Sequence, residues 1–258
     1  MLLNYKIYGE LDSQPPVIML HGLLGSLDNW NGQAKLLQQH YTVITVDLRN
    51  HGHSPHVSGM SYREMAADIV SLLEHLTIEQ CYLLGHSMGG KVAMTLALSQ
   101  PQFIKKLIIV DVAPKAYKPR HLQILQAMLS LPLDQIKTRK DADQYLAKWI
   151  HFDIERSFLL KNLKRNTEGF YWQCYLSEIA KHYLKISGFV LPKSARFLAD
   201  TLFIRGGLSD YIQDKDIANI QQIFPSATIE TLEHSGHLPH IEEINRFYQL
   251  VLNFLQAE

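Results

Sequence analysis

A serine flanked by glycines stands between a strand-like and a helix-like stretch in the first half of the chain. The segment GHSMG covers residues 85–89, with Ser87 at its centre, after apolar residues 81–84 and before the helical pattern of residues 91–99. A G-x-S-x-G string in this context predicts a nucleophile elbow, a strained turn that exposes the serine hydroxyl at the tip of a sheet. The N-terminus of the following helix would favour a developing oxyanion.

A serine hydroxyl needs a base to become a nucleophile, and three histidines near the end of the chain compete for that role. They are His234, His237 and His240 in the string EHSGHLPH. The expected chain order is serine, acid, histidine, with the base in a loop after the last strand. Gly236 allows a sharp turn directly before His237, which favours His237 as the base. His234 and His240 are predicted to be hydrogen-bonded structural residues.

The acid that would orient this histidine has two candidates. Asp111 follows the apolar run of residues 107–110, and Asp210 ends the loop RGGLSD at residues 205–210. Both loops are expected at the sheet edge that carries Ser87. From the residues alone, either aspartate could orient the imidazole, and either could instead form a turn.

Two backbone N–H groups are needed to hold an oxyanion. The amide of Met88, immediately after the nucleophile, is the first candidate. The second is the amide of Leu23, in the early turn HGLLG at residues 21–25. In this kind of site the second donor comes from a loop after an early strand, and that position matches Leu23.

Two further strings resemble other kinds of site. Gly85, Gly90 and Lys91 match most of a phosphate-binding loop, but the next residue is Val92, which lacks the hydroxyl that binds Mg²⁺. Lys91 is therefore predicted to be a surface or ion-paired helix residue. The string HGHSPH at residues 51–56 resembles a metal-binding pattern without supporting ligands, so a solvent-exposed loop is expected.

Apolar runs alternate with amphipathic stretches along most of the chain. Helices are expected at residues 29–39, 61–76, 87–99 and 240–255. Strands are expected at residues 16–20, 41–47, 81–85, 107–110, 201–204 and 227–232. This alternation predicts an α/β fold, with a mostly parallel central sheet flanked by helices.

The pattern changes in residues 114–194, which read as helical and without a strong strand. Because this segment is longer than one crossover helix, we expect a helical cap inserted over the carboxyl ends of the strands. The core domain would then comprise residues 1–113 and 195–258. The cap aromatics could line a pocket or pack the cap itself; they are Phe170, Tyr171, Trp172 and Tyr175.

Composition narrows the class of protein. Of the 258 residues, 25 are Lys or Arg and 25 are Asp or Glu, a balance that argues against a nucleic-acid partner or an acidic membrane surface. Cys81 lies in an expected buried strand and is predicted to be a free thiol. The first residues show no signal peptide and no membrane span, which predicts a cytoplasmic protein. The oligomeric state stays open.

Four segments in this order together resemble the α/β-hydrolase superfamily: HGLLGS, DLRNHGHS, GHSMGGKVA and SGHLPHIEE. They are most similar to the small bacterial acyl-ester hydrolases of the YbfF type. The resemblance implies Ser87, Asp111 and His237 as the catalytic residues, with Ser209 assisting the histidine. Asp210 departs from that pattern, so the choice between Asp111 and Asp210 as the catalytic acid stays open.

The resemblance further implies a serine hydrolase, an esterase or thioesterase acting on short-chain acyl esters and acyl-CoA through an acyl-enzyme on Ser87. Neither a cofactor nor a metal is expected, and the partner would be a small-molecule acyl ester or thioester. Two alternatives remain: a carbon–carbon hydrolase or lyase of the same fold, and a ligand receptor without turnover. Cap lysines could meet CoA phosphates or simply face solvent; they are Lys115, Lys118, Lys137 and Lys140.

Overall fold

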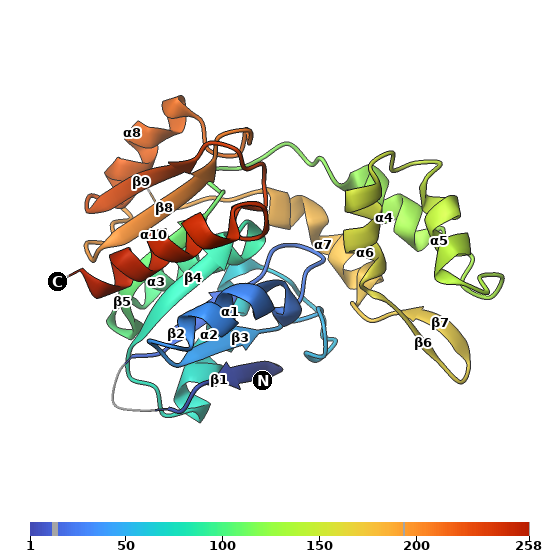
Figure 1. Ribbon diagram of the computed structural model, residues 1–258, viewed down its shortest axis with the longest axis horizontal. Coiled ribbons are helices and arrows are strands. Elements are labelled where there is room, and N and C mark those ends of the chain that lie inside the picture. The colour runs from blue at the N-terminus through green and yellow to red at the C-terminus, as the bar shows by residue number, and fades with distance from the viewer. Residues whose placement is uncertain (12–14, 193, 258) are drawn as a thin grey trace.

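The computed structural model describes residues 1–11, 15–192 and 194–257 and contains a seven-stranded sheet (Figure 1). Its strands lie in the order β1-β3-β2-β4-β5-β8-β9. Only β1 is antiparallel to its neighbour, and the other neighbouring strands run parallel. The strands are β1 (Tyr5–Tyr8), β2 (Val17–Leu20), β3 (Val43–Val46), β4 (Cys81–His86), β5 (Ile104–Val110), β8 (Thr201–Gly206) and β9 (Ala227–Leu232). The predicted fold class is confirmed.

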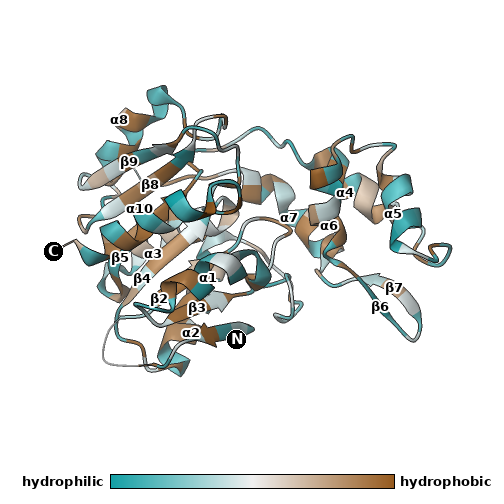
Figure 2. Ribbon diagram, in the orientation of Figure 1, coloured by the Kyte–Doolittle hydropathy of each residue, from teal (hydrophilic) through white to brown (hydrophobic). Residues whose placement is uncertain are grey.

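Helices cover both faces of this sheet because successive strand residues point to opposite sides. Val17 and Met19 of β2 belong to a core with α1 (Asn31–Leu37) and α10 (Ile244–Gln256). Ile18 and Leu20 face the opposite core, which includes residues of α2 (Tyr62–His75), α3 (Met88–Ser99) and α8 (Asp214–Ile223). Figure 2 shows hydrophobic and hydrophilic residues along α10, as expected of a helix with one face on the sheet.

Helix α2 begins where the sequence predicts it. The Ser61 hydroxyl accepts from the Glu64 amide at 3.2 Å, and the Ser61 amide donates to the Glu64 carboxylate at 2.8 Å. This reciprocal capping box satisfies two amides at the free helix end. Strand β1 and helix α8 lie outside the elements expected from the sequence.

The segment between β5 and β8 forms a lobe beside the sheet (Figure 1). It contains α4 (Leu122–Leu129), α5 (Arg139–Leu146), α6 (Asp153–Leu160), β6 (Leu163–Asn166), β7 (Gly169–Trp172) and α7 (Leu176–Ser187). The segment was expected to be helical without a strong strand, and it also contains a short antiparallel hairpin of β6 and β7. Asn162 donates to Leu24 O at 2.7 Å and so attaches the lobe to the turn after β2. We propose that this lobe is the cap.

The last helical region is interrupted, whereas a continuous helix at residues 240–255 was expected. A short helix, α9 (Pro239–Glu242), is followed by the non-helical residue Glu243, and α10 begins after it. The Glu243 carboxylate accepts from the Ser235 hydroxyl at 2.8 Å and from the His234 amide at 3.1 Å. Glu243, at the break between the two helices, therefore fixes the loop that carries His234 and His237.

The two cysteines, Cys81 and Cys174, are free and buried, which confirms the prediction for Cys81. In the described ranges, every helix is too short or too polar to cross a membrane.

Candidate active site

Ser87 stands at a sharp turn between β4 and α3. Its backbone has φ 51° and ψ −114°, a conformation that residues other than glycine rarely adopt. A Cβ on Gly85 would lie 2.3 Å from Gly89 O, and one on Gly89 would lie 2.5 Å from Leu20 O. Glycine is therefore required at both positions for strand and helix to approach this closely. The local geometry is that of the predicted elbow.

His237, in the loop after β9, lies between Ser87 and a carboxylate. Its Nε2 is 3.1 Å from Ser87 Oγ, and its Nδ1 is 2.7 Å from Asp111 Oδ2. Because a carboxylate accepts and does not donate, Nδ1 carries the proton. Nε2 is then the acceptor for the Ser87 hydroxyl, which is the arrangement a general base requires.

Asp111 is fully buried at the end of β5, where its left-handed backbone (φ 47°) marks a sharp turn. Besides His237, it accepts from the Gly206 amide at 3.1 Å and from the Ser209 hydroxyl. Ser209 thus contacts the carboxylate and not the histidine ring directly. These hydrogen bonds hold the carboxylate oxygens toward His237.

Asp210, the other candidate acid, points elsewhere. Its two carboxylate oxygens accept from Arg120 Nη1 and Nη2, each at 2.7 Å, and the pair is about half exposed. The hydrogen bond from Arg120 lowers the pKa of this carboxyl. The structure therefore brings Asp111 to His237, and leaves Asp210 in a surface ion pair.

Two neighbours that the sequence analysis did not single out hold His237. The Tyr211 ring stacks on its imidazole with centroids 3.8 Å apart. His86 Nε2 lies 2.7 Å from His237 O and donates to it, since the carbonyl only accepts. His240 is buried against Trp30, and among the described residues its Nδ1 has no partner. His240 was expected to be a hydrogen-bonded structural residue; at its Nδ1, ring packing takes the place of a hydrogen bond.

Both predicted oxyanion donors lie beside Ser87. Met88 is the first residue of α3, so its amide has no acceptor one turn earlier in the helix. Leu23 lines the same cavities as Ser87. The turn that carries Leu23 passes close to the elbow, since a Cβ on Gly22 would lie 3.4 Å from Ser87 Cβ. The arrangement is suited to holding a negatively charged oxygen.

Buried histidines support that turn. His51 Nε2 accepts from the Leu24 amide at 3.1 Å, and His21 Nε2 accepts from the Leu48 amide at 3.0 Å. The expectation of a solvent-exposed loop at residues 51–56 is therefore wrong for His51, which is fully buried. In the sequence, only the pattern R-N-H-G at residues 49–52 marks the position of His51. That pattern does not show that the histidine is buried and accepts from the Leu24 amide, because this contact forms only in the folded chain.

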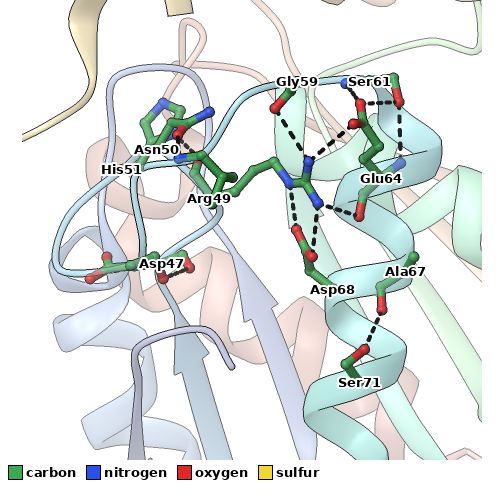
Figure 3. A network of polar contacts seen from close by, with 12 residues as sticks. Asp47, Arg49, Asn50, His51, Gly59, Ser61, Glu64, Ala67, Asp68 and Ser71 are labelled. Atoms are coloured by element: carbon green, nitrogen blue, oxygen red, sulfur yellow. Dashed lines mark hydrogen bonds and ion pairs between the residues drawn. The ribbon is translucent and has the colours of Figure 1, made fainter. Parts of the chain in front are cut away.

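An ion-pair network anchors this loop to α2. Arg49 donates to the Asp68 carboxylate at 2.6 and 2.9 Å and lies 3.4 Å from the Glu64 carboxylate (Figure 3).

Within the parts of the chain that the structure describes, no group of three or more His, Cys, Asp or Glu residues could hold a metal ion.

We expect these buried histidines to make the fold acid-sensitive. Burial lowers the pKa of His21 to about 4 and of His51 and His240 to about 3, and it also lowers that of His86. Below the unfolded-state pKa of about 6.5, the unfolded chain binds protons that the folded chain excludes. Stability is thus fully present above pH 6.5 and falls as the pH drops toward 4, by roughly 2 kcal/mol per histidine at pH 5.

Thermal unfolding followed by circular dichroism measures this effect. The midpoint at pH 5 should lie more than about 10 °C below the midpoint at pH 7.5. A midpoint that stays constant over this interval would contradict the neutral assignment of these histidines.

Two cavities meet at Ser87. The larger has a volume of about 890 Å³ and is also lined by His237. Its walls are largely apolar and come from both lobe and core: Ile124, Phe152, Ile154, Phe158, Leu159, Leu208 and Leu238. The cap aromatics at residues 170–172 and 175 are not among the lining residues of either cavity.

The smaller cavity, about 50 Å³, lies on the Met88 side of Ser87. It is lined by tyrosines and by Lys91, whose side chain is 3% exposed. The prediction that Lys91 is a surface or ion-paired residue is wrong, because it is buried and no ion pair with a carboxylate is formed within the described residues.

An open, mostly parallel sheet with a serine elbow, a late histidine and an inserted lobe defines a class of fold that hosts many chemistries. The family described as alpha/beta hydrolase fold matches residues 15–244. The chain belongs to this family.

Similar proteins cover nearly the whole chain. The sn-1-specific diacylglycerol lipase ABHD11 of Danio rerio is 38% identical over 98% of this chain and 82% of its own length. The esterase YbfF of Escherichia coli (strain K12) is 31% identical over 93% of this chain and 92% of its own. A solved structure of a marine microorganism esterase has a TM-score of 0.94 and 37% identity, covering 98% of this chain and 99% of that one.

Proposed function

We propose that this protein is a serine esterase that cleaves carboxylic esters with short acyl groups through an acyl-enzyme on Ser87. The observation that carries the proposal is the hydrogen-bonded series Ser87, His237 and Asp111 at the junction of two cavities. Relatives named as esterases and lipases support ester substrates for this chain.

His237 would remove the proton of Ser87 as the hydroxyl attacks the ester carbonyl. The Met88 and Leu23 amides would donate to the resulting oxyanion. As the tetrahedral intermediate collapses, the protonated His237 gives its proton to the leaving alcohol. Water then attacks the acyl-enzyme with His237 again as base, releasing the acid and restoring Ser87. Asp111, with Ser209 and Gly206 bound to it, would stabilise the imidazolium.

The sizes of the two cavities support a short acyl group and a longer apolar leaving group. The smaller cavity holds little more than a few heavy atoms, whereas the larger has the volume of ordinary ligand sites. Acyl-CoA thioesters undergo the same reaction and belong to the proposed substrate range. Lys118 lines the smaller cavity, on the acyl side, and Lys115 is paired with Asp216, so neither supports contact with the phosphates of a CoA leaving group.

A chain-length series tests the proposal. Purified protein should hydrolyse p-nitrophenyl acetate and butyrate, with kcat/KM falling by about tenfold or more from butyrate to decanoate as the acyl group outgrows the smaller cavity. Butyryl-CoA should be cleaved in a parallel thiol-release assay. Absence of turnover on all these substrates by folded protein would overturn the proposal and favour a ligand receptor.

A further inference from the structure

Lys91 is a buried cation without a buried counter-charge. Its ammonium lies 3.3 Å from Ser187 O and 3.5 Å from Gly188 O, at the end of α7. The rings of Tyr117 and Tyr62 flank it, with centroids 4.8 and 5.6 Å from Nζ. An ammonium has three donors, and within the described chain only these two carbonyls accept from it. One N–H is therefore left for a ligand.

The surroundings of the two cavities differ in charge. The smaller one is lined by Lys91 and Lys118 and has neither aspartate nor glutamate among its lining residues. The larger one contains Glu155 and Glu242 at its walls. A negatively charged group would therefore be attracted to the smaller cavity and repelled by the larger.

The positions of His237 and Met88 indicate which part of an ester enters each cavity. His237 lines the larger cavity, and the leaving alcohol must lie near it to receive a proton. Met88 lines the smaller one, where its amide would hold the carbonyl oxygen. The acyl chain therefore extends into the smaller cavity, toward Lys91.

We propose that Lys91 is a specificity-determining residue that binds a carboxylate at the far end of a short acyl chain. The preferred substrates would be monoesters of short dicarboxylic acids with an apolar alcohol. Ser87 is the N-cap residue directly before α3, Lys91 lies in the first turn of that helix, and both residues line the smaller cavity. A two-carbon spacer between ester carbonyl and carboxylate suits this cavity, because its volume of about 50 Å³ leaves room for only a short chain. This inference rests on the proposed esterase function.

The test compares two esters that differ only at the acyl terminus, hexyl hemisuccinate and hexyl butyrate. The carboxylate of the first replaces the methyl group of the second. At pH 6.5, kcat/KM for the hemisuccinate should exceed that for the butyrate by about tenfold or more, the size of effect that one well-placed polar contact gives. In Lys91→Met, which keeps the length of the side chain and removes its charge, that ratio should fall to about one or below.

Lys106→Met is the matched control. Lys106 is also a buried lysine whose ammonium donates to two backbone carbonyls, Phe254 O and Ala257 O, but it lies outside both cavities. Its replacement should leave the substrate ratio unchanged. If Lys91 served only to fasten the end of α7 to the core, Lys91→Met would lower both rates in the same proportion, and the inference would be overturned.

The pH dependence of the ratio gives a second readout. Burial lowers the pKa of Lys91 to about 7, so its positive charge is present below that pH and lost above it. The preference for the hemisuccinate should therefore decline as the pH rises from 6 to 8.5. Effects of pH that act on both esters alike cancel in the ratio.

Wild-type protein also tests the inference without a variant. Succinate should inhibit butyrate-ester hydrolysis competitively, at about a tenfold lower concentration than butyrate does. Equal inhibition by the two acids, with hexyl butyrate still hydrolysed, would refute the role of Lys91 and leave the esterase proposal intact. Failure to hydrolyse either ester would overturn both.

Discussion

Replacing Ser87 with alanine is expected to lower kcat for p-nitrophenyl butyrate by a factor of about 10⁴ to 10⁶. Without the hydroxyl, His237 has no proton to remove at 3.1 Å and no acyl-enzyme forms. The small rate that remains would come from direct attack of water on the bound ester, with the oxyanion donors still in place. Steady-state hydrolysis by purified variant and wild type measures the loss.

Ser71→Ala is the control for this variant. The Ser71 hydroxyl donates to Ala67 O within α2 and lies on the exposed side of that helix (Figure 3). Its removal should change kcat by less than about twofold, as for surface substitutions remote from a site. If Ser87→Ala kept more than about a hundredth of wild-type activity while remaining folded, another nucleophile would have to carry the reaction.

The second large effect is expected from Asp111→Asn, which should lower kcat by about 10⁴. The amide nitrogen of asparagine would donate to His237 Nδ1, so the imidazole proton would move to Nε2 and face Ser87. The base would then be in the wrong tautomer. The Gly206 amide donates to the other carboxylate oxygen, Oδ1, and so favours the amide oxygen at that position and the nitrogen toward His237. The Ser209 hydroxyl, which donates to the same oxygen that His237 contacts, would have to turn and accept from the new amide.

Asp210→Asn separates the two candidate acids. This carboxylate is paired with Arg120 on the surface, so its replacement should alter kcat by less than about threefold. Both variants are compared by initial rates over pH 5 to 9, with thermal unfolding as the check on folding. A loss in Asp210→Asn that equals or exceeds the loss in Asp111→Asn would assign the orienting acid to Asp210.

The elbow could be predicted from sequence because its determinants are local. A strand, two glycines around Ser87 and a helix follow one another directly in the sequence. Gly85 is required by a contact within the turn, and Gly89 by the close approach of Leu20 O at the end of β2. The acid could not be derived in the same way. Asp111 and Asp210 both follow parallel strands, and the choice depends on which carboxylate reaches His237 from another strand.

The surroundings of Lys91 and His51 were not predictable from their own segments. Lys91 is covered by Tyr62, Tyr117 and Phe189, which come from three distant parts of the chain. The hairpin β6–β7 escaped prediction because its strands are short and most of its residues are partly or fully exposed. For Lys91 and His51, the deciding factor was packing against residues far away in the sequence, which no periodicity records.

Active-site labelling followed by peptide mapping tests directly whether Ser87 is the nucleophile. A fluorophosphonate reacts with a serine only where a base and oxyanion donors activate it. We expect one label per chain, located on Ser87 by mass spectrometry, with simultaneous loss of ester hydrolysis. A label on a different residue, or full activity in unlabelled protein after prolonged treatment, would contradict the assignment of Ser87 as nucleophile.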